Sequence, residues 1–153
     1  INIKVGLHTH NNMQMCYSNA LTFIKINNER DIIIDSSVSG MGKGAGNLPT
    51  ELIMMYLNEK EKLEYNLQPI YDMANGVIAN YKKKYNWGYC HEYLLSAIHK
   101  CTPSYINYFI KEKELEFNDI QNVLSNMNET EKVAFNKEYA NDLLRKCMID
   151  KNN

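Results

Sequence analysis

The sequence GLHTHNN, at residues 6–12, follows a short apolar run over residues 1–7. An apolar run of this length predicts a buried β-strand. Because side chains two positions apart in a strand point to the same face, we expect His8 and His10 to project together at the end of that strand. Two neighbouring imidazoles are typical ligands of a divalent metal ion. The motif is short, so the alternative of one core histidine and one histidine at a loop edge stays open.

A second stretch, DSSVSGMGKGAGN, occupies residues 35–47 and follows another apolar run over residues 32–34. Its glycines allow the backbone to approach a ligand closely, and we predict a helix directly after it, from Pro49 to about residue 57. Since a helix N-terminus attracts anions, the loop is either a cradle for a phosphate or carboxylate or a tight turn without a ligand. The order of its glycines matches neither a P-loop nor a dinucleotide-binding fingerprint.

The residues between the two stretches predict a helix over residues 13–26, with Asn11 or Asn12 as its N-cap. Its apolar positions recur at spacings of three and four, and they are Met13, Tyr17, Ala20, Leu21 and Ile24. The order strand, helix, strand predicts a βαβ unit, whose two strands run parallel.

From residue 66 onward the chain is expected to be helical throughout, which gives predicted domains over residues 1–65 and 66–153. The clearest helix is predicted over residues 69–85, where an apolar stripe recurs with helical period at Ile70, Met73, Ala74, Val77, Ile78, Tyr81 and Tyr85. Further helices are predicted to begin near residue 89, Thr102, Asn118 and Asn128. The tail over residues 150–153 is expected to fray.

Composition and charge exclude several classes of protein. The 153 residues include 17 basic and 18 acidic side chains, so there is no electrostatic case for a nucleic acid or an anionic membrane as partner. No apolar stretch reaches the length of a membrane-spanning helix. The four cysteines are widely spaced, so we expect reduced thiols in the cytoplasm rather than a disulfide framework or a zinc finger.

Taken together, the two stretches resemble the metal-dependent aldolase and lyase superfamily of TIM barrels. That group includes 4-hydroxy-2-oxovalerate aldolase, 3-hydroxy-3-methylglutaryl-CoA lyase and the 2-isopropylmalate synthase type. The motifs that carry the resemblance are HTHNN at residues 8–12 and GMGKGAGN at residues 40–47, in this order. They are most similar to 4-hydroxy-2-oxovalerate aldolase, strongly over residues 3–57 and weakly to about residue 100.

The resemblance implies an α/β fold: the C-terminal quarter of a TIM (β/α)₈ barrel, followed by an all-helical C-terminal domain. The strands over residues 1–7 and 32–38 would be the last two of eight barrel strands. Because the chain opens inside a strand, we expect it to be a piece of a longer protein. A whole barrel needs roughly 250 residues, so we expect no turnover from this chain alone.

The resemblance also implies a metal site at the C-terminal face of the barrel. His8 and His10 would bind Mn²⁺ or Mg²⁺, and Asn47 would lie near or on the metal. The remaining ligand of the family, an Asp beside an Arg on the first barrel strand, is not in this chain. A catalytic Tyr of the family's helical part aligns with Tyr93, with Tyr89 as second choice, and packing of this Tyr between helices is the alternative.

The implied function is a lyase that cleaves or forms a C–C bond of a 4-hydroxy-2-keto acid, giving pyruvate and an aldehyde. Such an acid chelates the metal, which then stabilises the enolate formed on cleavage. Two alternatives stay open: an acyl-CoA-dependent Claisen condensing enzyme, and a non-catalytic barrel that serves as an assembly module. The expected partners are the 2-keto acid, further copies of the chain, and an acylating aldehyde dehydrogenase docked on the helical domain.

Overall fold

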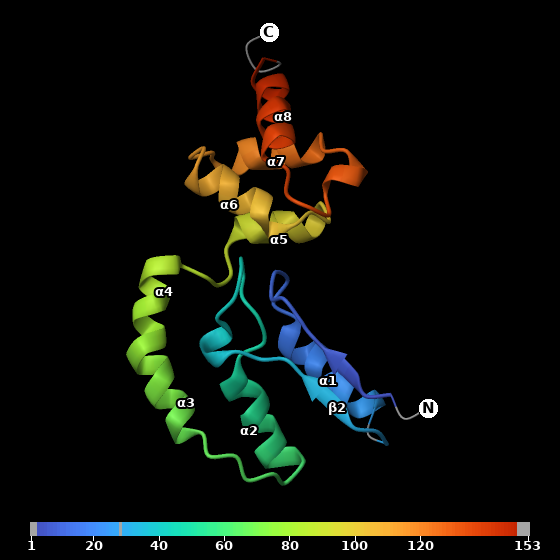
Figure 1. The fold of residues 1–153 in the computed structure, drawn as a ribbon, viewed down its shortest axis with the longest axis vertical. Helices are drawn as coiled ribbons and strands as arrows, with labels where there is room; N and C mark the ends of the chain where they lie inside the picture. The colour runs from blue at the N-terminus through green and yellow to red at the C-terminus, as the bar shows by residue number, and fades with distance from the viewer. Residues whose placement is uncertain (1–2, 28, 150–153) are drawn as a thin grey trace. The chain divides into compact units, whose positions relative to one another are not determined.

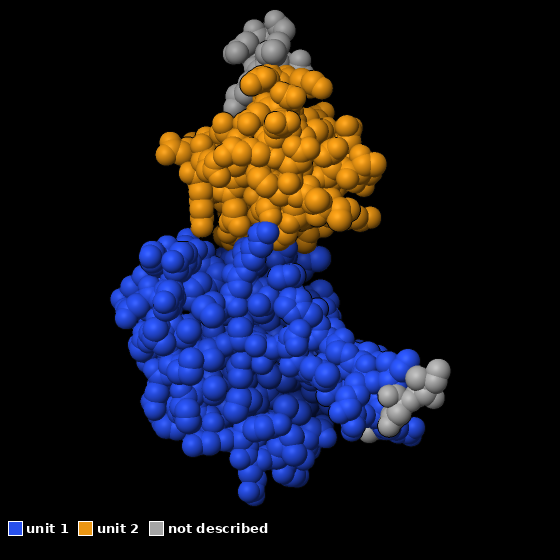
Figure 2. Space-filling view, viewed as in Figure 1, with its two compact units in different colours: residues 1–89 blue, residues 90–153 orange. Residues whose placement is uncertain are grey.

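The computed structural model describes residues 3–27 and 29–149 (Figure 1). Contacts between residues divide the chain into two compact units, unit 1 over residues 1–89 and unit 2 over residues 90–153 (Figure 2). Unit 1 is a helix-rich α/β structure with a small parallel sheet. The described elements of unit 2 are all helices.

The sheet of unit 1 consists of β1 (Val5–Leu7) and β2 (Ile32–Ile34), which pair in parallel with Gly6 opposite Ile33. Helix α1 (Cys16–Ile26) connects them, so the predicted parallel βαβ unit is confirmed. Ile33 is 53% exposed, whereas its two neighbours in β2 are half-buried. One face of the sheet therefore packs on helices, while the other is open within the described part of the chain.

Helix α1 begins at Cys16, three residues later than the apolar spacing predicts. Gln14 has a φ of 58°, and a left-handed residue cannot continue a right-handed helix. The predicted helix position of Met13 is therefore wrong, and its side chain is exposed. Asn11 does not occupy the N-cap position, yet its Oδ1 accepts a hydrogen bond from the Cys16 amide at 3.3 Å.

The core of unit 1 lies between α1 and α2 (Thr50–Lys60), which runs somewhat beyond its predicted end. Cys16, Ala20 and Ile24 are spaced by four, so they form one face of α1, and this face packs with Leu48 and Ile53. Half-buried side chains of both strands pack against the same cluster. The helices thereby hold one face of the sheet and leave its carboxyl ends accessible.

The helix predicted over residues 69–85 forms as α3 (Gln68–Met73), a π-helical segment η2 (Ala74–Ile78) and α4 (Ala79–Tyr85). The wide turn falls at Gly76, whose φ and ψ are −93° and −107°. Of the predicted apolar stripe only Ile78 is buried, while Met73, Val77, Tyr81 and Tyr85 are exposed. The apolar period thus correctly predicted helical structure. Most of the apolar side chains are nevertheless not buried by other described residues of unit 1.

The division between the compact units falls after Tyr89, and the expected domains over residues 1–65 and 66–153 stay a prediction. Two hydrogen bonds just beyond α4 contribute to this division. The Trp87 Nε1–H donates to the Ser39 carbonyl at 3.1 Å, and the Gly88 amide donates to the Gly44 carbonyl at 3.1 Å. These bonds join the segment after α4 to residues 35–47, called the glycine loop below, within unit 1.

Unit 2 contains α5 (His91–Ile98), α6 (Pro103–Lys111), α7 (Phe117–Ser125), the 3₁₀ turn η3 (Glu129–Glu131) and α8 (Lys137–Ile149). Thr102 is the N-cap of α6, as predicted, with its side chain accepting from the Ser104 amide. The two predicted capping boxes are wrong: α7 already begins at Phe117, and Asn128 precedes only the short turn η3. The tail over residues 150–153 lies outside the described residues.

The core of unit 2 is built from large side chains with almost no exposure: Tyr105, Ile106, Phe109, Ile120 and Leu124. All four cysteines of the chain are free thiols. Among the described residues, no helix combines the length and the apolar character needed to cross a membrane.

Candidate metal centre

The side chains of His8 and His10 lie next to each other just beyond the carboxyl end of β1. The strand alternates half-buried and exposed positions from Val5 onward, and both histidines fall on exposed positions. Their ring centres lie 5.1 Å apart, with an angle of 84° between the ring planes. The period of two inferred from the sequence thus brings both imidazoles to the carboxyl end of β1.

The spacing of the two rings suits one shared ion. A ring nitrogen binds a divalent metal at about 2.1 Å, so the ion lies about 3.2 Å from the ring centre, and two rings around it at 90–110° have centres about 4.5–5.2 Å apart. The observed 5.1 Å lies in this range. Among the described residues, however, no group of three or more His, Cys, Asp or Glu side chains is placed to hold a metal. The described residues thus do not form a complete metal-binding group, and the role of the two imidazoles as metal ligands stays a prediction.

Asn47 is brought to the histidines by the backbone. His10 and Asn47 form an isolated antiparallel β-bridge, and the Asn11 amide donates to the Gly46 carbonyl at 2.9 Å. The side-chain Nδ2 of Asn47 donates to the Met41 carbonyl at 3.2 Å. Its Oδ1 is buried and has no hydrogen-bond partner within the described residues. A buried amide oxygen without a partner is unusual, and it is a suitable ligand for a hard cation such as Mg²⁺ or Mn²⁺.

The glycine loop is shaped around Asn47. Gly46 has a φ of 84°, and a Cβ on it would overlap the Gly40 carbonyl oxygen. A Cβ on Gly42 would lie 2.6 Å from the Asn47 Nδ2. Close packing thus accounts for these glycines without an anion, which favours the tight turn over the phosphate or carboxylate cradle.

A hollow of about 360 Å³ lies beside His8 and Asn47, while His10 is not part of its lining. Its lining comprises His8, Ile34, Asp35, Ser36 and Asn47. It joins the end of β1, the end of β2 and the glycine loop, so it lies at the carboxyl ends of both parallel strands. This is the edge at which ligands bind in parallel α/β folds.

Asp35 was not singled out as a site residue from the sequence. Its Oδ2 lies 3.1 Å from the Nδ1 of His8. The signal that could have revealed it is positional: Asp35 follows the last residue of β2 just as His8 follows the last residue of β1. Parallel pairing without an offset places such residues beside each other.

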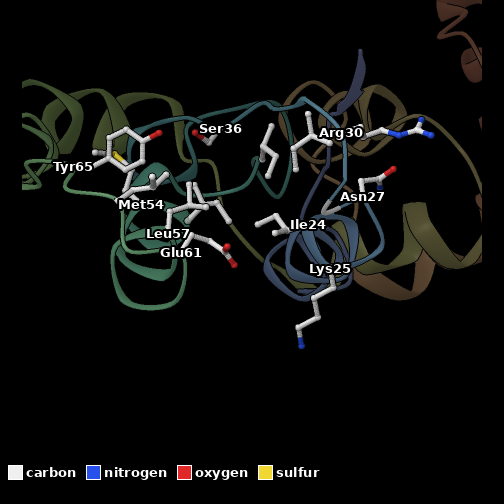
Figure 3. A pocket seen from close by; sticks show the side chains of 13 residues that line it. Ile24, Lys25, Asn27, Arg30, Ser36, Met54, Leu57, Glu61 and Tyr65 are labelled. Carbon is white, nitrogen blue, oxygen red and sulfur yellow. The ribbon is translucent and has the colours of Figure 1, made fainter. Parts of the chain in front are cut away.

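A larger hollow, of about 830 Å³, lies in unit 1 between α1, β2, α2 and the segment after α2 (Figure 3), and shares Ile34 and Ser36 with the smaller one. Apolar side chains such as Ile24 and Leu57 line it together with the charged groups of Lys25, Arg30 and Glu61. It contains none of the predicted site residues. The smaller hollow is therefore the candidate site.

Tyr93 lies in α5 of unit 2, where it is buried with 6% exposure. Its hydroxyl donates to the Asn107 Oδ1 at 2.6 Å, and burial raises the pKa of this phenol. This hydrogen bond joins α5 to α6 (Pro103–Lys111), as expected for a side chain that packs between helices. The second choice, Tyr89, is exposed at the end of unit 1. The catalytic role of Tyr93 stays a prediction.

The fold and the site define an α/β protein whose polar centre lies at the carboxyl ends of parallel strands and combines two imidazoles with an amide. Comparison with known families gives a match to the HMGL-like family over residues 1–77. The chain belongs to the HMGL-like family. Its matched part ends inside η2 (Ala74–Ile78), so unit 2 lies outside the family match.

Relatives support this assignment over the same region. The chain is 38% identical over 80 residues to 4-hydroxy-2-oxovalerate aldolase of Bacillus thuringiensis, which is 52% of this chain and 23% of the relative. It is 39% identical over 77 residues to the protein of the same name from Shewanella pealeana, covering 49% of this chain and 22% of the relative. The chain thus spans less than a quarter of the length of these curated relatives.

A solved structure shows a similar fold. It is the crystal structure of the N-terminal domain of a candidate aldolase from Bacteroides vulgatus, with 30% sequence identity and a TM-score of 0.62. The similarity covers 76% of this chain and 36% of that one.

Proposed function

We propose that this chain forms the metal-binding edge of an aldolase that cleaves or forms a C–C bond of a 4-hydroxy-2-keto acid. The observation that carries the proposal is the placement of His8 and His10, with ring centres 5.1 Å apart, beside Asn47 at the carboxyl ends of two parallel strands. The names of the relatives support an aldol reaction over the Claisen alternative.

In this proposal β1 and β2 are neighbouring strands of a TIM barrel. The half-buried positions of the strands would face the helices, and the open face with Gly6, Ile33 and the histidines would face the barrel interior. Active sites of such barrels lie at the carboxyl ends of the strands, where both imidazoles are found.

The residues of this chain would act by holding and orienting groups. His8 and His10 would hold Mn²⁺ or Mg²⁺ through ring nitrogens, and Asn47 would add its buried amide oxygen. The bound cation would supply Lewis-acid stabilisation of the enolate that C–C cleavage leaves next to a 2-keto acid. The backbone β-bridge between His10 and Asn47 supports this role, because it brings the two residues together without a ligand.

The test uses the protein in its full natural length. His8→Ala and His10→Ala should each lower Mn²⁺ affinity by at least tenfold, measured as free Mn²⁺ by electron paramagnetic resonance. Both should abolish pyruvate release from a 4-hydroxy-2-keto acid. His91→Ala, which removes an exposed imidazole from α5 (His91–Ile98), is the matched control and should behave as the wild type.

Unchanged Mn²⁺ affinity in both site variants would refute the proposal. Release of thiol from acetyl-CoA in place of aldol cleavage would favour the Claisen alternative. Full metal binding with no turnover of either substrate would favour the non-catalytic barrel.

We further propose that unit 2 provides the surface for an acylating aldehyde dehydrogenase and for self-association, and that the protein works in the cytoplasm. Light scattering during size-exclusion chromatography would report the oligomeric state. A variant without residues 90–153 would show whether this unit is required for either contact.

A further inference from the structure

We infer that Asp35 is a positioning residue for His8: its carboxylate holds the imidazole in the tautomer that leaves Nε2 free to bind a metal. This inference rests on the proposed function, because it gives Asp35 a task only if His8 is a ligand.

The strand register puts the two side chains together. The parallel pairing of β1 with β2 sets Leu7 opposite Ile34, and the Asp35 amide donates to the Leu7 carbonyl at 2.9 Å. The next residues, His8 and Asp35, therefore face each other across the strand ends. The backbone pairing thus sets the two side chains beside each other.

The hydrogen bond between them selects one tautomer. The Asp35 Oδ2 lies 3.1 Å from the His8 Nδ1. An ionised carboxylate can only accept, so Nδ1 must carry the proton. A neutral imidazole has one such proton, so Nε2 is left with a lone pair. In this tautomer the ring donates to the carboxylate from one side and can bind a cation from the other.

The position of the carboxylate also suits this task. Asp35 lines the same hollow as His8 and Asn47. A carboxylate hydrogen-bonded to a metal-binding histidine fixes the ring orientation and raises the basicity of the ligand nitrogen. Free histidine prefers the opposite tautomer, with its proton on Nε2, so without Asp35 the ligand nitrogen would be protonated most of the time.

A second exposed aspartate beside the sheet, Asp31, provides a control for the loss of negative charge in Asp35→Ala. Asp31 and Lys4 form an ion pair at 3.6 Å at the other end of the two strands, and both side chains are well exposed. Asp31→Ala removes a carboxylate at the amino end of β2, away from the carboxyl end that carries Asp35, and touches neither histidine. Its effect measures what the loss of one exposed strand-end carboxylate does by itself.

The test compares Asp35→Ala with Asp31→Ala in the protein in its full natural length. Asp35→Ala should raise the Kd for Mn²⁺ by about 10–100-fold, and Asp31→Ala should leave it within twofold. Asp35→Asn keeps an acceptor oxygen and should fall between the wild type and Asp35→Ala. The thermal unfolding midpoints of the metal-free Asp35→Ala and Asp31→Ala variants should agree, because the lost contact orients a side chain and does not support the core.

A second measurement reads the tautomer directly in the metal-free protein. Nitrogen-15 NMR of labelled histidines should show His8 with its proton on Nδ1, and Asp35→Ala should move that proton to Nε2. His8→Ala identifies the signal.

The outcomes separate the two proposals. If His8→Ala weakens Mn²⁺ binding but Asp35→Ala does not, or if His8 carries its proton on Nε2, the positioning role is wrong and the metal site stands. If His8→Ala leaves Mn²⁺ binding unchanged, the metal site is wrong and the role of Asp35 falls with it.

Discussion

At the scale of single residues, the candidate centre consists of side chains from three segments: the end of β1, the end of β2 and the glycine loop. His8 and His10 come from one strand end, so their spacing alone predicted their proximity. Asn47 was reached through a resemblance of the glycine loop, and Asp35 was not singled out. The common property of the last two is that long-range backbone pairing places them, through the His10–Asn47 bridge and the register of β1 with β2.

A substitution of Gly42 would test whether the glycine loop fixes the position of the Asn47 side-chain amide. A Cβ at this position would lie 2.6 Å from the Asn47 Nδ2 and 2.9 Å from its Oδ1. Gly42→Ala should therefore push the amide away from its place and weaken Mn²⁺ binding by about tenfold. The cost in stability should stay near or below about 1 kcal/mol, because only the end of a flexible side chain must move. Isothermal titration and urea unfolding would measure the two effects.

The control for this variant is Gly76→Ala. A Cβ on Gly76 meets no atom within 4 Å, so this variant should bind Mn²⁺ as the wild type does. A Gly42→Ala protein with unchanged affinity would show that the position of the Asn47 amide does not matter for the metal.

At the scale of elements, the glycine loop is stabilised by a contact from the segment after α4 as well as by hydrogen bonds among its own residues. Trp87 follows α4 (Ala79–Tyr85), is buried, and donates from Nε1 to the Ser39 carbonyl at 3.1 Å. Ser39 has a φ of 53°, an uncommon conformation for a residue other than glycine. The segment that follows α4 thus stabilises the left-handed turn at Ser39, which leads into the part of the loop that contains Asn47.

Trp87→Phe tests this support. The variant keeps an aromatic ring but loses the N–H, so the Ser39 carbonyl loses its partner, and we expect a loss of about 1–2 kcal/mol in unfolding free energy. Amide hydrogen exchange over residues 39–47 should become faster, because the loop opens more easily. Tyr85→Phe, at an exposed position at the end of the same helix, should change neither quantity. Unchanged exchange in Trp87→Phe would mean that the loop is held by other contacts.

At the scale of the whole molecule, the two units differ in their buried ionisable groups. Burial raises the pKa of Cys90 and of Cys101 to about 11, and it also raises the pKa of the Tyr93 and Tyr105 phenols. All four groups belong to unit 2. In unit 1 burial raises the pKa of Cys16. High pH should therefore act more strongly on unit 2.

The direction follows from proton linkage. A group with a raised pKa in the folded state stabilises the fold fully below its unfolded pKa, here 9.0 for the thiols, and this contribution is lost as pH rises toward about 11. Between pH 9 and 11 the unfolding midpoint of unit 2 should fall by about 5 °C or more. Far-UV circular dichroism reports all helices, whereas fluorescence of Trp87, the single tryptophan of this 153-residue chain, reports unit 1.

Cys101→Ala is the matched variant for this experiment. It should show a smaller fall over the same pH range, since one of the thiols that ionise only at high pH is gone. Equal falls for fluorescence and circular dichroism, in the wild type and in this variant alike, would contradict the assignment to unit 2.

Local patterns in the sequence were enough for the parallel βαβ unit, the pairing of His8 with His10, the capping of α6 (Pro103–Lys111) by Thr102 and the family. Each of these depends on residues close together in the chain, whose spacing obeys the period of a strand, the period of a helix or the chemistry of a cap. The start of α1 was missed because the left-handed conformation of Gln14 leaves no mark in an apolar pattern.

Three features needed the folded chain. They are the exposure of most of the stripe on residues 69–85, the unit boundary after Tyr89, and the contact of Asp35 with His8. An apolar period tells which residues share a face, but not whether another element covers that face. Likewise, neither the bonds from Trp87 and Gly88 to the glycine loop nor the strand register can be read from neighbouring residues. These hydrogen bonds and the strand pairing join segments far apart in the chain, so they form only in the tertiary structure.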